Sequence, residues 1–258
     1  MKKHNKKNKR QHLEDNIQLM EQDEYIKDTS PIVPQRSKIK NPLHIYTRPD
    51  LTEKQKEFIN LALDKNTKLI FVDGPAGTAK THNAVYASLK LLNDKKVSDI
   101  IYIRSLVESA DRSMGYLKGS ESEKLQPYMI PLMDKLSEML PKQEIDMLIK
   151  DERIIGMPIN FLRGTSFAVR ALILDESQNC TYKEIFTFIT RIGEFCKVFV
   201  IGDGDQSDIN GKSGFQKIMS RFCDDESKSN GVFTFKFGEE DVVRSELCKF
   251  IMKKAKPS

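Results

Sequence analysis

Residues 74–81 read Gly-Pro-Ala-Gly-Thr-Ala-Lys-Thr, a glycine-rich turn that ends in Lys-Thr. The apolar run at 68–73 has the length of a short strand, and residues 83–92 repeat apolar side chains at helical spacing. This context indicates a phosphate loop, because backbone N–H groups of the turn and of the helix N-terminus then face an anion. The stretch predicts a nucleoside triphosphate site. An ordinary strand–turn–helix joint is the alternative.

The last residues of this phosphate loop have separate expected roles. Lys80 is expected to reach the β- and γ-phosphates, and the Thr81 hydroxyl to ligate Mg²⁺. Ala79 stands where glycine is usual, and its methyl group could tighten or distort the loop near the β-phosphate. The predicted nucleotide-binding residues of this segment are Gly74, Pro75, Ala76, Gly77, Thr78, Ala79, Lys80, Thr81 and His82.

Two acidic residues follow another apolar strand. The run at 168–175 is apolar enough for burial on both faces of a sheet, and Asp175 and Glu176 come at its end. Ligands bind beyond the carboxyl ends of the strands in an open parallel sheet, so these acids are expected to face the phosphate loop. We predict that Asp175 holds Mg²⁺, directly or through water, and that Glu176 orients or deprotonates the attacking water.

A further polar group is expected at the same edge. The strand at 197–203 leads into Gln206, whose amide both donates and accepts hydrogen bonds. Gln206 could therefore contact the γ-phosphate or the attacking water. A simple polar turn is the alternative for this segment.

The remaining segments complete an alternation of strands and helices. We expect strands at 97–104 and 231–237, and helices at 52–63, 125–149 (interrupted at Pro131 and Pro141), 182–191 and 241–252. This alternation predicts an α/β fold with a doubly wound, mostly parallel sheet of the P-loop NTPase (RecA-like) type. A single such domain is expected over residues 46–258.

The N-terminal part of the chain differs in composition from the rest. Residues 1–45 are polar and contain three prolines, which predicts a largely disordered leader and linker. Ten of the first 40 residues are basic and six are acidic. This leader could neutralise nucleic-acid phosphates or serve as a solvated tail. Four cysteines without C-x-x-C spacing and the lack of a long apolar run favour a cytoplasmic protein with no membrane partner.

The order of these motifs resembles that of the PhoH-like P-loop ATPases, which are related to the RecA-like core of superfamily 1 helicases. The resemblance extends over about residues 50–252. It is carried by Asp-Glu-Ser-Gln-Asn at 175–179, Thr-Arg-Ile-Gly at 190–193, Val-Ile-Gly-Asp-Gly-Asp-Gln at 200–206 and Glu-Asp-Val-Val-Arg at 240–244. The departures from the family pattern are Ala79, Ser105 and Ser177.

The resemblance implies an ATPase that uses ATP and Mg²⁺ and couples hydrolysis to the handling of RNA or single-stranded nucleic acid. It suggests that Gln55 reads the adenine edge, with an exposed helix glutamine as the alternative. Candidate arginine fingers are Arg163, Arg191 and Arg244, each of which could instead be a structural ion-pair partner. Helicases of this class clamp ATP between two RecA-like domains and this length suits one, so a homo-oligomer, such as a ring, is expected.

Other functions remain open at this level. A nucleotide-gated binding or regulatory module with little or no turnover is the main alternative, and Ala79 could favour it. A small-molecule kinase is less consistent with a carboxylate pair suited to activating water. A GTPase is disfavoured because no Asn-Lys-x-Asp guanine-reading motif occurs.

Overall fold

The computed structural model describes residues 41–105, 121–162, 166–204, 206, 209 and 213–255. The chain separates into two units, residues 1–33 and 34–258, and every described residue belongs to the second unit. Of the predicted leader, only residues 41–45 are described. The disorder of the leader and the domain boundary after residue 45 therefore stay predictions.

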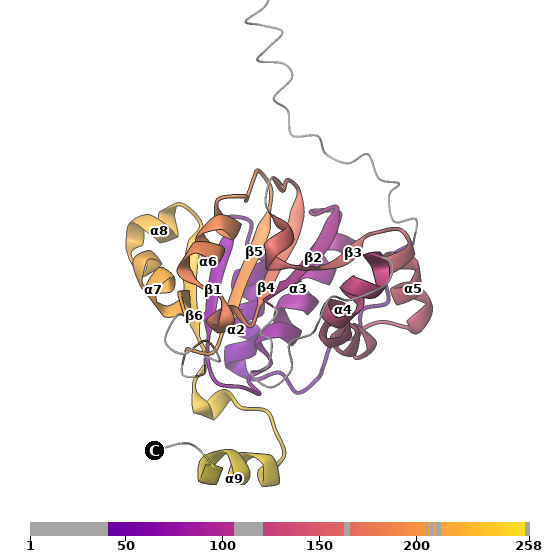
Figure 1. The fold of residues 1–258 in the computed structure, drawn as a ribbon. Coiled ribbons are helices and arrows are strands. Elements are labelled where there is room, and N and C mark those ends of the chain that lie inside the picture. The colour runs from indigo at the N-terminus through magenta and orange to yellow at the C-terminus, as the bar shows by residue number, and fades with distance from the viewer. Residues whose placement is uncertain are drawn as a thin grey trace, which may run out of the picture. The chain divides into compact units, whose positions relative to one another are not determined.

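A six-stranded sheet forms the centre of the described part of the chain (Figure 1). Its strands lie in the order β3-β2-β4-β5-β1-β6, and all five pairings are parallel. The strands are β1 (Leu69–Asp73), β2 (Asp99–Arg104), β3 (Ile154–Pro158), β4 (Arg170–Asp175), β5 (Lys197–Gly202) and β6 (Val232–Lys236). Asp73 pairs with Gly202, and Arg104 with Asp175, so the carboxyl ends of β1, β2, β4 and β5 meet at one edge.

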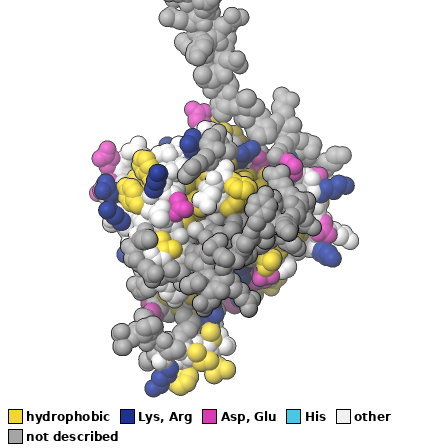
Figure 2. Space-filling model, in the orientation of Figure 1, with side chains coloured by type: hydrophobic (Ala, Val, Ile, Leu, Met, Phe, Trp, Pro, Cys, Tyr) yellow, Lys and Arg dark blue, Asp and Glu magenta, His cyan; other side chains and the backbone are white. Residues whose placement is uncertain are grey.

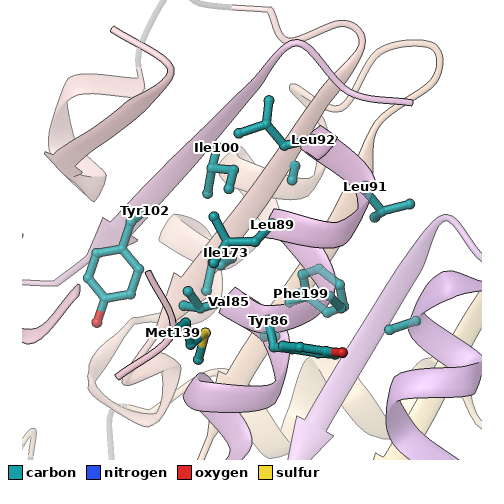
Figure 3. Close-up of a cluster of buried hydrophobic side chains, with 14 of the residues drawn as sticks. Val85, Tyr86, Leu89, Leu91, Leu92, Ile100, Tyr102, Met139, Ile173 and Phe199 are labelled. Carbon is teal, nitrogen blue, oxygen red and sulfur yellow. The ribbon is translucent and has the colours of Figure 1, made fainter. Parts of the chain in front are cut away.

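Helices cover both faces of the sheet, which confirms the predicted doubly wound arrangement. They are α2 (Glu53–Leu63), α3 (Lys80–Asn93), α4 (Glu121–Ser137), α5 (Lys142–Lys150), α6 (Tyr182–Ile189), α7 (Phe215–Met219), α8 (Asp225–Ser229) and α9 (Glu246–Ala255). One hydrophobic core joins α2 to α5 with the sheet, and the other joins α6 and α7 with it. In Figure 3, Val85 and Leu89 of α3 lie beside Ile173 of β4. Every residue of β1 and β5 is buried, as expected for strands covered on both faces.

Two details differ from the sequence prediction, and a third agrees with it. The helix expected to be interrupted at Pro131 is continuous, since α4 runs through this position and Leu132 and Leu136 anchor it in the core. The predicted interruption at Pro141 is confirmed, because this residue caps the start of α5. The last helix begins at Glu246 rather than at residue 241, because residues 239–241 form a 3₁₀ turn.

Strand β3 and the short helices α7 and α8 were not predicted. Strand β3 is five residues long and contains Gly156 and Pro158, which are depleted in strands. A Cβ at Gly156 would lie 2.5 Å from Met129 Sδ on α4, so a larger residue there would require the Met129 side chain to shift. A short edge strand of this kind is recognised only when the covering helix is known.

Helix α9 lies apart from the sheet in Figure 1. It exposes Leu247, Phe250 and Ile251, and Figure 2 shows hydrophobic side chains gathered at that end of the molecule. Within the described ranges, no helix has both the length and the apolar character that crossing a bilayer requires.

Candidate functional site

A cavity of about 400 Å³ opens at the carboxyl ends of the central strands. The phosphate loop lines it from one side, and Asp175, Glu176, Asp203 and Gln206 line it from the other. These polar groups follow β1, β4 and β5, which are far apart in the sequence. The parallel register brings them together, as the sequence predicted.

The phosphate loop adopts positive φ at three positions. Gly74 has φ +153° and Gly77 has φ +91°, and a Cβ on Gly74 would lie 2.7 Å from Phe237 Cβ. Ala79 has φ 64° and ψ 26°, in the left-handed region, directly before α3 begins. This conformation costs an L-residue roughly 1 kcal/mol relative to glycine. The replacement noted in the sequence therefore places backbone strain beside the lysine.

Lys80 occupies the first position of α3 and turns back over the loop. Its Nζ donates to the carbonyl oxygens of Gly74 at 2.5 Å and Pro75 at 2.9 Å. Burial lowers the pKa of Lys80, while the nearby carboxylates of Asp203 and Asp175 act in the opposite direction. The ammonium group lies at the cavity wall, where an anion could compete with the two carbonyls for it.

Thr81 and Asp175 form the contact expected of a magnesium site. Thr81 Oγ1 donates to Asp175 Oδ1 over 2.9 Å, and both residues line the cavity. A hydroxyl and a carboxylate are hard oxygen ligands of the kind that Mg²⁺ prefers, and Mg²⁺ sites commonly use few protein ligands beside phosphate and water. These two residues therefore fit a Mg²⁺ ion, and they are the ones that would hold it.

Glu176 is held from two sides. Its backbone has φ 54°, a strained conformation for a residue that is not glycine. Arg104 Nη2 lies 3.4 Å from Oε1, and Gln178 Nε2 donates to Oε2 over 2.6 Å. The same Gln178 amide accepts a hydrogen bond from the backbone N–H of Asp203 at 3.1 Å. Gln178 thus links the loop after β4 to the loop after β5, and it fixes the orientation of Glu176.

Comparison with known proteins agrees with this geometry. The family model described as "PhoH-like protein" matches residues 49–256. The chain belongs to the PhoH family. PhoH proteins are of the P-loop NTPase type, so this is a nucleotide-binding protein of that type.

Three PhoH relatives illustrate the extent of the similarity. The "PhoH-like protein" of Mycobacterium tuberculosis (strain ATCC 25618 / H37Rv) is 35% identical over 203 residues, which are 78% of this chain and 56% of the relative. "Protein PhoH" of Escherichia coli (strain K12) is 34% identical over 207 residues, or 79% of this chain and 57% of the relative. The "PhoH-like protein" of Bacillus subtilis (strain 168) is 34% identical over 202 residues, or 77% and 60%. The chain therefore spans less than two thirds of the length of these relatives.

The three candidate arginine fingers of this PhoH chain have different positions. Arg244 lines the cavity, and a Cβ on Gly77 would lie 2.5 Å from Arg244 Nε. Arg191 lies at the opposite edge of the sheet, because its carbonyl accepts from the N–H of Phe167, which precedes the amino end of β4. Arg163 lies outside the described residues. Within one chain, the structure thus brings Arg244 and not Arg191 to the cavity.

Gln55 is buried, and both its amide nitrogen and its amide oxygen make hydrogen bonds within the chain. Its Nε2 donates to the carbonyl of Thr78 at 3.4 Å, and its Oε1 accepts from the N–H of Thr52 in the capping box of α2. Gln55 therefore ties the start of α2 to the phosphate loop. The predicted contact with adenine stays a prediction.

His82 and Gln206 both line the cavity but differ in exposure. His82 is buried, and burial lowers its pKa, while its Nε2 lies 3.5 Å from Glu138 Oε2. Gln206 is exposed, and its backbone N–H donates to the carbonyl of Asp203 at 3.2 Å. Its proposed contact with phosphate or water stays a prediction.

Sequence reasoning missed three residues that organise the site. Gln178 lies inside the Asp-Glu-Ser-Gln-Asn motif, which is the one sequence signal that could have drawn attention to it. Asp73 accepts from the Gly204 N–H and from Gln216 Nε2, both at 2.9 Å, and so ties the end of β1 to the loop after β5. Tyr102 lies within an apolar strand and gives no sequence signal at all.

Proposed function

We propose that this PhoH chain is a Mg²⁺-dependent ATPase that couples hydrolysis to the handling of RNA or single-stranded nucleic acid. The observation that carries the proposal is the meeting of Lys80, the Thr81–Asp175 pair and Glu176 at one cavity. Phosphoryl transfer to water requires positioning and stabilisation of charge, together with a group that orients the water.

Each of these residues has a distinct part in the proposed reaction. Lys80 would leave its two loop carbonyls for the phosphates and neutralise their charge. Glu176 would accept the proton of the attacking water, with its carboxylate oriented by Arg104 and Gln178. Mg²⁺ bound by Thr81 and Asp175 would neutralise phosphate charge as it develops.

Replacing Glu176 by glutamine tests the hydrolytic half of the proposal. Glu176→Gln keeps the size of the side chain and one acceptor oxygen but removes the base. We expect ATP binding to persist and turnover to fall by about a hundredfold or more. Glu57→Gln, at an exposed position of α2, is the matched control and should leave turnover unchanged. Wild-type turnover no faster than that of Glu176→Gln would exclude an ATPase.

Coupling to nucleic acid is supported by the resemblance to helicase-like ATPases and by the basic composition of the leader. Added RNA or single-stranded DNA should raise ATP turnover. Deletion of residues 1–12 should weaken salt-dependent binding if the leader contacts phosphates. Turnover indifferent to every nucleic acid tested would remove this half of the proposal and leave the ATPase half intact.

A homo-oligomer is also proposed. Arg191 lies at the sheet edge away from the cavity of its own chain, so it could act as a finger only in the site of another copy. The exposed apolar residues of α9 supply a surface of the kind that interfaces use. Sedimentation with ATP and Mg²⁺ tests this, since a strictly monomeric and fully active ATPase would contradict it. A cytoplasmic location and a leader over residues 1–45 also stay predictions.

The positive φ of Ala79 supports a second candidate, a nucleotide-gated module with little turnover. If strain at this position slows the site, Ala79→Gly should raise turnover severalfold and stabilise the protein by up to about 1 kcal/mol. Turnover that stays negligible in both proteins, with tight ATP binding, would favour the module over the enzyme.

A further inference from the structure

Tyr102 reaches the carboxylate of Asp175 from inside the core. Its side chain is fully buried, and its hydroxyl donates to Asp175 Oδ2 over 2.5 Å. In the register of β2 and β4, Tyr102 pairs with Ile173, two residues before Asp175, so both side chains project from the same face of the sheet. Figure 3 shows Tyr102 at the margin of the hydrophobic cluster, with its hydroxyl directed away from the labelled apolar side chains.

The hydrogen bonds to Asp175 are divided between its two oxygens. Thr81 Oγ1 and the backbone N–H of Glu176 both donate to Oδ1, at 2.9 Å and 3.1 Å. The Tyr102 hydroxyl alone among the described residues donates to Oδ2. The carboxylate therefore cannot rotate about its bond to Cβ without breaking bonds on both sides.

We propose that Tyr102 is a positioning residue for the metal site, and that its hydroxyl holds the Asp175 carboxylate in the orientation that binds Mg²⁺. The inference rests on the proposed function, because it takes Thr81 and Asp175 as the residues that hold the ion. A ligand fixed by a second hydrogen-bonded residue binds a metal more tightly than one that must be ordered on binding. Packing alone would not require tyrosine here, because phenylalanine has the same ring.

Tyr102→Phe isolates the hydroxyl. Binding of a fluorescent ATP analogue to the full chain is measured first in EDTA and then across a Mg²⁺ titration. We expect an unchanged affinity in EDTA and a Mg²⁺ midpoint raised roughly three- to tenfold, the scale of one lost hydrogen bond. Circular dichroism and thermal unfolding establish that the variant is folded under the conditions of the titration.

Tyr86→Phe is the matched control. Tyr86 belongs to the same hydrophobic core, and its hydroxyl bonds to Thr47 Oγ1 at 2.8 Å, away from Asp175. This variant should leave the Mg²⁺ midpoint unchanged. An unshifted midpoint in Tyr102→Phe, or an equal shift in both variants, would overturn the positioning role and leave the ATPase proposal standing. Wild-type binding that is indifferent to Mg²⁺ would instead refute the proposed metal site itself, and this inference with it.

Discussion

The two edges of the sheet each bury an aspartate, but they surround it differently. At the cavity edge, Asp175 accepts hydrogen bonds from two neutral hydroxyls and a backbone N–H. At the opposite edge, Asp99 at the start of β2 is fully buried and contacts Arg170 at 3.2 Å and Arg153 at 3.8 Å. An aspartate neutralised by arginines holds strands together. The hydrogen-bond donors to Asp175 are neutral, which leaves its carboxylate available to a cation at the cavity.

Two lysines, Lys197 and Lys80, show the same contrast. Lys197, the first residue of β5, donates to backbone carbonyls of Asp64, at 2.7 Å, and Thr67, and burial lowers its pKa to about 8. Lys80 also donates to carbonyls, but it lies at the cavity wall with Asp175 and Asp203 nearby. Lys197 therefore links β5 to the loop after α2, whereas Lys80 faces the cavity where phosphate is expected.

Removing the charge at the structural edge should have the largest effect on stability. Asp99→Asn takes away the negative charge beside the buried guanidinium group of Arg153 and the partly buried one of Arg170, and we expect a loss of about 3–5 kcal/mol in the free energy of unfolding. Urea unfolding measures this. Nucleotide affinity of the folded fraction should remain close to that of the wild type. A loss below about 1 kcal/mol would show that this edge does not depend on its ion pairs.

The matched change at the cavity edge, Asp175→Asn, should reduce Mg²⁺-dependent nucleotide binding and leave the free energy of unfolding almost unchanged. Asp175→Asn retains an oxygen for Thr81 and a partner for the Tyr102 hydroxyl, so the free energy of unfolding should change by less than about 1 kcal/mol. The gain in nucleotide affinity on adding Mg²⁺ should fall by about a hundredfold or more, because a charged ligand is lost. Equal destabilisation by this variant and by Asp99→Asn would erase the distinction between the two edges.

The smallest expected effect is the pH dependence of stability that Lys197 causes. Between pH 8 and 10.5 the unfolded chain carries a proton on this lysine that the folded chain has lost. Stability should therefore rise with pH across this window, by about 1 kcal/mol per pH unit, and stay level for this group below pH 8. Unfolding curves at pH 7 to 10 give the free energy of unfolding of the wild type and of Lys197→Met. The difference between the two proteins isolates the contribution of this lysine. A flat difference would mean that burial does not disfavour the charge.

Most strands of the fold could be predicted from residue order, and the reasons are local. Strands such as β1 and β5 are continuous apolar runs, and Thr52 marks the start of α2. Pro131 misled the helix prediction because the burial of its neighbours outweighed the lost backbone hydrogen bond. The edge strand β3 was not predicted, because the sequence around Gly156 has no strand pattern. Gly156 packs against Met129 of α4, and this contact is visible only in the folded chain.

The chemistry of the site follows the same division. The phosphate loop and the two acids at the end of β4 were recognisable in the sequence. A glycine-rich turn ending in Lys-Thr, combined with two carboxylates at the end of an apolar strand, is typical of few sites other than a nucleotide site. The loop and the acids line one cavity because the strands are parallel and their carboxyl ends align. The roles of Tyr102 and Gln178 became visible only in three dimensions, since each acts on a residue presented by a neighbouring turn or strand. Side-chain hydrogen bonds between strands leave no periodicity in the chain, so only the folded structure shows that Asp99 contacts two arginines while Asp175, the proposed metal ligand, contacts two hydroxyls.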